Sequence, residues 1–194
     1  MSPDLILSLA LGVGLAAAVG FRVFLPLFIY GLAVHQGVLA GASGFEWASS
    51  TSALVMFAAA GTVEIIAYYV PFLDNALDAV ASPLAIAAGI GVTAAALGDA
   101  PPMLKWALAI IAGGGIAAAT QGATTALRGV STATSAGIAN HLLTTGEIIG
   151  AIALSLVAIL LPYVALVAVA LLAVIIIWAF RRRWKKSTNG RSAK

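Results

Sequence analysis

One segment sets the pattern for the rest of the chain: Gly12-Val-Gly-Leu-Ala-Ala-Ala-Val-Gly-Phe-Arg-Val-Phe-Leu-Pro26. It is apolar enough to enter a bilayer, yet it carries an arginine, Arg22, four residues before the proline. Proline removes a backbone donor and clashes with the preceding turn, so a helix through this segment is predicted to break. A related run, Gly115-Ile-Ala-Ala-Ala, is also followed by an arginine, Arg128. The sequence therefore predicts two related halves, each with a small-residue segment and an arginine.

The composition indicates a polytopic membrane protein. Of 194 residues, 62% are hydrophobic and only 9% are charged, and the mean hydropathy is +1.08. Soluble domains carry roughly 25% charged residues, and a soluble globule of this size has no interior large enough for so many apolar side chains. A membrane span needs about 20 apolar residues, so the chain has room for roughly five to seven spans and no soluble domain.

Hydropathy predicts an all-helical bundle of about six spans. The first span, at about 45 Å, exceeds the roughly 30 Å hydrocarbon core, and we expect it to break at Gly20 and Pro26. The glycine run around Gly114 predicts a similar weak point in the second half. If Pro162 only kinks one long helix, there are five spans and the N-terminus is outside. The six predicted spans are 5–34, 52–70, 81–97, 103–127, 143–161 and 163–180.

The positive charge is concentrated at the C-terminal end. Seven of the ten Lys and Arg residues lie within residues 181–194. The positive-inside rule places this basic tail in the cytoplasm, and six spans then place the N-terminus there too. We expect one transmembrane domain, residues 1–180, in the cell's inner (plasma) membrane, with the tail attracted to anionic lipid headgroups. The tail is too short and too close to the bilayer to favour nucleic acid as a partner.

A second match supports an internal repeat. Thr62-Val-Glu64-Ile-Ile-Ala67 resembles Thr145-Gly-Glu147-Ile-Ile-Gly150, in the same order as the glycine-alanine match. The repeats would cover about residues 4–98 and 103–180, with three spans each. An odd number of spans inverts the second copy, which is the arrangement of many secondary transporters. Composition bias alone is the competing explanation.

We single out four charged residues that lie within the predicted spans or at a span's end. Because charges in a bilayer are costly, they face protein or water. They either line a pathway for a ligand or ion, together with the polar Thr132 and Asn140, or form Arg–Glu pairs that lock helices together. The four residues are Arg22, Glu64, Arg128 and Glu147.

The remaining polar residues give no sign of an enzyme. Asp74 and Asp78 share one face of a helix, but two carboxylates are too few for a calcium site, and we expect an exposed acidic turn in the cytoplasm. The chain has no cysteine and only two histidines. It has no Ser-His-Asp pattern, and its glycine run lacks the Lys-Ser/Thr of a phosphate-binding loop. We therefore predict no catalytic residue, no metal site and no cofactor.

Together these residues resemble a known family. The chain is similar to DUF4126 (domain of unknown function 4126), an uncharacterised bacterial integral-membrane family. The resemblance departs from the family pattern at Leu77, where tryptophan is common, at Ser82, where arginine is common, and at Ile148, where aspartate is usual. It implies a multi-span membrane protein and brings no established activity. Four stretches carry it: Gly20-Phe-Arg-Val-Phe-Leu-Pro-Leu27, Glu64 to Ala85, Arg128 to Asn140, and Glu147.

Two functions follow from the sequence as hypotheses. The first is a small transporter or channel-like protein whose paired Arg and Glu residues lie near the pathway. The second is a membrane scaffold or lipid-interacting protein in which the same charges are closed structural pairs. The bilayer is the expected partner in both cases, and a second copy of the chain is a further candidate.

Overall fold

The computed structural model describes residues 3–70, 73–135 and 138–189, without the side chains of 74–75, 179–180 and 182–189. The described residues are mostly helical and contain no strand. Its elements are α1 (Pro3–Val19), α2 (Phe24–His35), the 3₁₀ turn η1 (Glu46–Ser49), α3 (Thr51–Tyr68), α4 (Leu73–Ala96), α5 (Pro102–Leu108), the π-helical η2 (Ala109–Gly114), α6 (Gly115–Ser135), α7 (Asn140–Leu160) and α8 (Pro162–Asn189).

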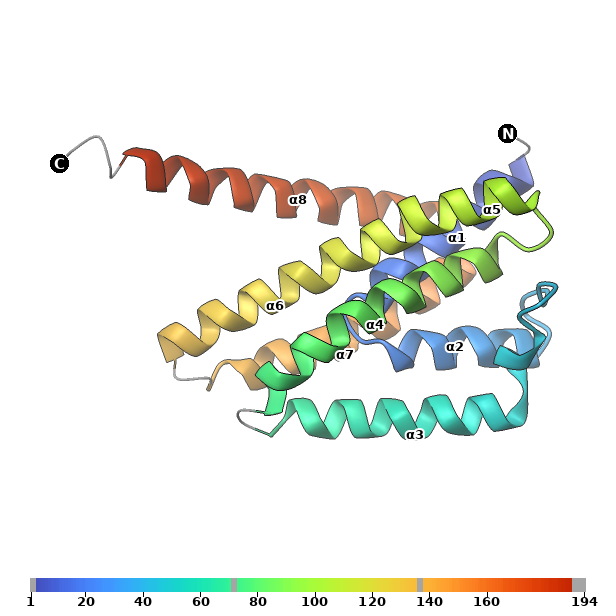
Figure 1. The fold of residues 1–194 in the computed structure, drawn as a ribbon, viewed down its shortest axis with the longest axis horizontal. Helices are drawn as coiled ribbons and strands as arrows, with labels where there is room; N and C mark the ends of the chain where they lie inside the picture. The colour runs from blue at the N-terminus through green and yellow to red at the C-terminus, as the bar shows by residue number, and fades with distance from the viewer. Residues whose placement is uncertain (1–2, 71–72, 136–137, 190–194) are drawn as a thin grey trace.

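The first two helices form a hairpin. Figure 1 shows that α1 runs into the bundle and α2 returns toward the end from which α1 came. The chain reverses at residues 20–23, beside Gly20, and Pro26 lies in the first turn of α2, where its missing N–H is no loss. A Cβ built on Gly20 would lie 2.5 Å from Cβ of Thr120, so the hairpin tip lies directly against α6. This contact requires glycine at the tip.

Helix α1 is the centre of the bundle. Every residue from Gly12 to Val19 is buried, which means that other helices cover all sides of this part of α1. Its small residues allow this: a Cβ built on Gly14 would lie 2.8 Å from Cβ of Ala158 in α7 and 3.0 Å from Cβ of Ala165 in α8. Small residues let neighbouring backbones approach in membrane bundles.

The other helices run alternately between the two ends of the bundle. Pro3, at the start of α1, and Asn189, at the end of α8, consequently lie at opposite ends (Figure 1). We predicted both termini on one side of the membrane from six single crossings. In the structure the predicted first span doubles back at residues 20–23, so that α1 and α2 form a hairpin, and Pro162 separates α7 from α8.

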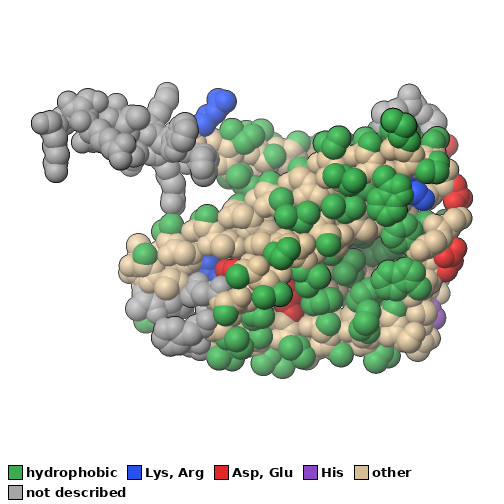
Figure 2. Space-filling model, in the orientation of Figure 1, with side chains coloured by type: hydrophobic (Ala, Val, Ile, Leu, Met, Phe, Trp, Pro, Cys, Tyr) green, Lys and Arg blue, Asp and Glu red, His purple; other side chains and the backbone are tan. Residues whose placement is uncertain are grey.

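Among the described residues, four helices are long and apolar enough to cross a membrane. Three shorter apolar helices accompany them: Pro3–Val19, Phe24–His35 and Pro162–Trp178. Figure 2 shows hydrophobic side chains over the middle of the visible face, with acidic side chains gathered at the end where α4 passes into α5. A membrane-embedded helical protein accounts for this surface. The four candidate spans are Thr51–Tyr68, Ala76–Ala96, Pro102–Ser135 and Asn140–Leu160.

Two segments expected to interrupt the second half are helical. Around Gly114 the chain forms the π-helical η2 inside one continuous helical stretch, Pro102–Ser135, instead of breaking. Residues 128–135, which lie between the predicted spans 103–127 and 143–161, continue α6 as far as Ser135. Their hydroxyl groups explain this, because Thr134 donates to the Val130 carbonyl (2.9 Å) and Ser135 to the Ser131 carbonyl (2.8 Å). Hydroxyls that bond to the preceding turn are satisfied within a helix.

Candidate functional site

Three of the four predicted charged residues meet at the hairpin tip. Nη2 of Arg22 lies 2.7 Å from Oε2 of Glu147, and Nη2 of Arg128 donates a hydrogen bond to the same oxygen. The exposed fractions of these side chains are 1% for each arginine and 6% for the glutamate. The tip, α6 and α7 each supply one residue. One carboxylate oxygen thus bridges two buried guanidinium groups.

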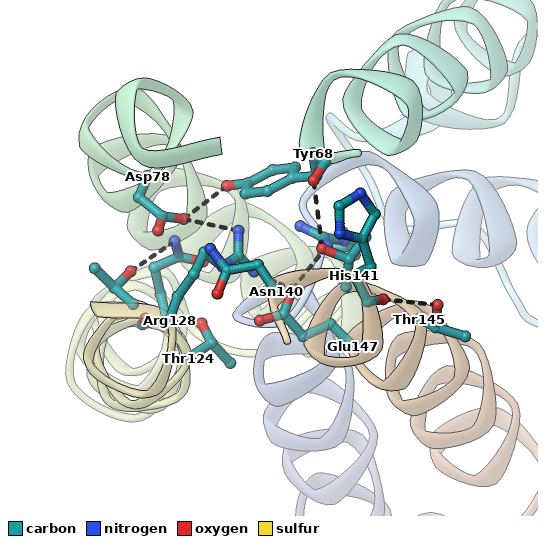
Figure 3. Close-up of polar contacts among 12 residues, drawn as sticks. Tyr68, Asp78, Thr124, Arg128, Asn140, His141, Thr145 and Glu147 are labelled. Carbon is teal, nitrogen blue, oxygen red and sulfur yellow. Dashed lines mark hydrogen bonds and ion pairs between the residues drawn. The ribbon is translucent and has the colours of Figure 1, made fainter. Parts of the chain in front are cut away.

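Tyr68 and Asp78 complete this cluster. The tyrosine hydroxyl donates to Oδ1 of Asp78 (3.0 Å), and Nη1 of Arg128 lies 3.4 Å from that oxygen. The Tyr68 ring contacts both cations, with Cζ of Arg22 3.9 Å and Cζ of Arg128 4.4 Å from its centroid. Cation–π contacts of this kind stabilise desolvated arginines. Figure 3 shows Tyr68, Asp78, Arg128 and Glu147 pointing toward one another from four helices.

The position of Asp78 differs from the expected exposed turn. Asp78 lies in α4 and is only 5% exposed, because Arg128 and Tyr68 supply the partners that a buried carboxylate needs. The side chain of Asp74 lies outside the described residues. Helix α4 therefore begins eight residues before the predicted span, and Asp78 belongs to the buried cluster.

Glu64 has a separate role at the start of α2. Its two carboxylate oxygens accept hydrogen bonds from the backbone N–H groups of Val23 (2.9 Å) and Phe24 (3.2 Å). The first N–H groups of a helix have no partner within it, and inside a bilayer no water is available to supply one. The helix dipole also favours a negative charge there. Glu64 thus caps α2 from α3 and fixes the hairpin tip that carries Arg22.

This arrangement predicts the effect of removing the Glu64 carboxylate. We expect Glu64→Leu to lower the free energy of unfolding by about 2 kcal/mol or more, because two buried N–H groups lose a charged acceptor. Glu64→Gln should lose less, since its amide oxygen still accepts one bond. Reversible unfolding in mixed detergent micelles measures both. Equal stability of the leucine variant and the native protein would contradict the capping role.

The cluster balances two cations against two carboxylates but leaves donors unused. Nε of Arg22 and Nε of Arg128 are buried, and neither has a hydrogen-bond acceptor among the described residues. A buried donor on a charged group destabilises the protein when it makes no hydrogen bond. An oxyanion is the ligand that paired guanidinium groups bind best, because its oxygens accept several N–H groups at once. The geometry can therefore accept an anionic group in place of, or beside, Glu147.

The remaining predicted site residues lie at one end of α6 and α7. Nδ2 of Asn140 donates to Oγ1 of Thr132 (3.0 Å), which ties the two helices together where the chain passes between them. Within the described residues there is no group of three or more His, Asp or Glu side chains that could hold a metal ion.

Tyr68 was not among the residues predicted from the sequence. Its signal was the spacing from Glu64, since residues four apart share one face of a helix.

Comparison with protein families gives one clear match. The model of the family described as "Domain of unknown function (DUF4126)" covers residues 9–182. That range includes every residue of the charged cluster. Comparisons with curated proteins and with solved structures give no match.

Proposed function

Because the chain belongs to the DUF4126 family, which carries no assigned activity, we propose a function from its geometry: a small membrane transporter that binds an anionic group between Arg22 and Arg128. One observation carries this proposal, the sharing of a single Glu147 oxygen by two buried arginines. Two arginines on one carboxylate form a site in which an incoming anion competes with the residue already there. Buried charge in a membrane protein is a functional signal by default.

The proposed cycle depends on Glu147. With no anion bound, its carboxylate pairs with both guanidinium groups, and Asp78 supplies the second negative charge. When an anion enters, Glu147 gives up one or both arginines and moves away from them, since a second negative charge beside the first is unfavourable. The arginines come from different parts of the fold, the hairpin tip and α6. Release of their shared partner would let these parts move relative to each other, as alternating access requires.

The proposed membrane arrangement follows the directions of the helices. Five stretches cross the bilayer (α3, α4, α5 to α6, α7 and α8), while α1 and α2 enter and return as a re-entrant hairpin. Arg181, in the last third of α8, begins the basic tail, which marks the cytoplasmic side in this arrangement. The start of α1 then faces outside. Re-entrant backbone is tolerated at this depth because protein surrounds it.

A structural role is the second candidate, and the burial of the cluster favours it. The two arginine side chains are 1% exposed and contact the Tyr68 ring, as expected for ion pairs that hold helices together and exclude water. In that case the cluster holds the hairpin in place and no anion enters. The two functions differ in the effect of added anions and in the access of water to the cluster.

Charge movement in proteoliposomes tests the transport function. Rapid addition of inorganic phosphate, sulfate or butyl phosphate on a supported membrane is expected to produce a transient current. Arg22→Gln should abolish it, because one guanidinium of the pair is lost while Glu147 keeps Arg128 as a partner. Lys105→Gln is the matched control, since Lys105 donates to the Gly98 carbonyl (3.0 Å), away from the cluster. No current with any of the three anions and correctly folded protein would contradict transport.

A further inference from the structure

A crevice opens beside the charged cluster, between α3 and α4. Its volume is about 310 Å³, and nine of its eleven lining residues are apolar. The two others are Glu64 and Tyr68. Since the Glu64 oxygens are held by the N–H groups of Val23 and Phe24, the crevice offers an almost entirely apolar wall. The apolar residues are Val23, Phe24, Ala60, Val63, Ala67, Leu77, Val80, Ala81 and Leu84.

The crevice opens on the outer surface of the bundle. Val63 is 66% exposed and Val80 is 64% exposed, so both walls reach the surface that contacts lipid. In a bilayer no water fills such an apolar opening, because hydrocarbon surrounds it. An acyl chain is therefore the natural occupant.

The crevice also has the right position along the membrane. On α3 it extends from Ala60 to Tyr68, which is about 12 Å of helix, close to half of the roughly 30 Å hydrocarbon core. Tyr68 is the last residue of α3. This terminus of α3 lies at the same end of the bundle as the C-terminus of α8 (Figure 1). The crevice thus runs through one leaflet, the leaflet on the side of the basic tail.

Tyr68 joins the crevice to the arginines. The same side chain lines the crevice and contacts both guanidinium groups through its ring. A molecule with its chain in the crevice would have its polar end at the Tyr68 end, where the two cations lie behind the ring. An apolar crevice with a lining residue that contacts buried positive charge is complementary to an anionic amphiphile.

We propose that the crevice holds an acyl chain of an anionic bilayer lipid and that the headgroup of this lipid is the anion bound by Arg22 and Arg128. The inference rests on the proposed function and specifies its substrate class. The shared chemistry is a phosphate group, which either a lipid or free phosphate can supply. The crevice favours the lipid.

Photolabelling in liposomes tests the occupant. The probes are phosphatidylglycerol and phosphatidylcholine that carry the same diazirine-labelled acyl chain, and the labelled residues are mapped by mass spectrometry. We expect phosphatidylglycerol to label residues 60–68 and 77–84 several-fold more than phosphatidylcholine does. Arg22→Gln should remove this preference for the anionic headgroup. Excess inorganic phosphate should compete only weakly, because it has no chain.

Filling the crevice provides the matched comparison. Ala67→Phe places a ring in the crevice, whereas Ala59→Phe places the same ring on an exposed position of α3 outside its lining. The first should reduce labelling several-fold and the second should not. Ala60→Leu serves as a smaller filling variant if the first folds poorly. Loss of labelling in either filling variant, with the Ala59 variant unchanged, supports the inference.

Two results would overturn the inference without deciding the proposed function, which the current assay tests independently. Equal labelling by both lipids, or labelling unaffected by the filling variants, excludes a selective lipid site. If inorganic phosphate then still drives a current that depends on Arg22, the anion transporter stands with a soluble substrate. If selective labelling occurs without any anion-driven current, the lipid site stands and transport of a soluble anion fails.

Discussion

Glu147→Gln is expected to lower the free energy of unfolding by about 3–5 kcal/mol, the cost of removing one partner from a buried ion pair. The physical reason is that Glu147 bridges Arg22 and Arg128, so its neutralisation leaves two buried cations close together with Asp78 as the other carboxylate of the cluster. Reversible unfolding in mixed detergent micelles measures this loss. Glu46→Gln, at an exposed position, is the matched control and should have no measurable effect.

Two further measurements separate the possible causes of that loss. Removing one cation as well, in the double variant Arg22→Gln with Glu147→Gln, should recover part of the stability, because the charge imbalance falls. Added sulfate or phosphate should also stabilise the Glu147→Gln protein, and should do so much more than it stabilises the native protein. A Glu147→Gln variant as stable as the Glu46→Gln control would show that the bridge does not exist.

Arg128→Gln is expected to lose more stability than Arg22→Gln, again by about 3–5 kcal/mol for a broken buried pair. Arg128 contacts both carboxylates of the cluster, whereas Arg22 contacts Glu147 alone among them. Its loss leaves Asp78 with the Tyr68 hydroxyl and Glu147 with one cation. After Arg22→Gln, by contrast, Arg128 still contacts both carboxylates, although one negative charge is left uncompensated. The same unfolding measurement on both variants, with Lys105→Gln as control, gives the order.

The order of the two arginine variants is the informative result. If Arg22→Gln were the more damaging, the ion pairs would not determine stability and packing at the hairpin tip would be the main cause. The order also affects the interpretation of the transport assay. The milder Arg22→Gln variant is the right one for a loss of current in a folded protein.

Much of the fold was predictable because the bilayer imposes simple rules. Composition and hydropathy identified an apolar helical protein, and the family resemblance is confirmed over residues 9–182. The direction of the second helix was not predictable. A break at residues 20–23 is compatible with either a kinked crossing or a return, and the choice depends on packing of Gly20 against α6.

The site was predictable only by residue type. Costly charges in apolar segments pointed to Arg22, Arg128 and Glu147, which the structure brings together. The partner of Glu64 was not predictable, because it consists of backbone N–H groups, which almost every residue has. Asp78 was misjudged since its partners, Tyr68 and Arg128, come from two other helices. The apparent equivalence of Glu64 and Glu147 in the repeat does not extend to their contacts.

The central claim, that an anion reaches the buried arginines, is tested most directly by water access to their cluster. The chain has no cysteine, so a single Thr144→Cys exchange places a reporter at a fully buried position one turn from Glu147. Exposed controls are Val38→Cys and Ile138→Cys, on loops at opposite ends of the bundle. Each is treated with a negatively charged, membrane-impermeant thiol reagent from either side of the membrane.

We predict that the cysteine at 144 reacts from the side on which the cysteine at 138 reacts, and that the cysteine at 38 reacts only from the other side. Such a result would show a hydrated path to the cluster from the end of the bundle that carries Ile138. Absence of reaction at 144 from both sides, in a folded protein whose two controls react, would contradict transport and establish the cluster as a closed structural lock.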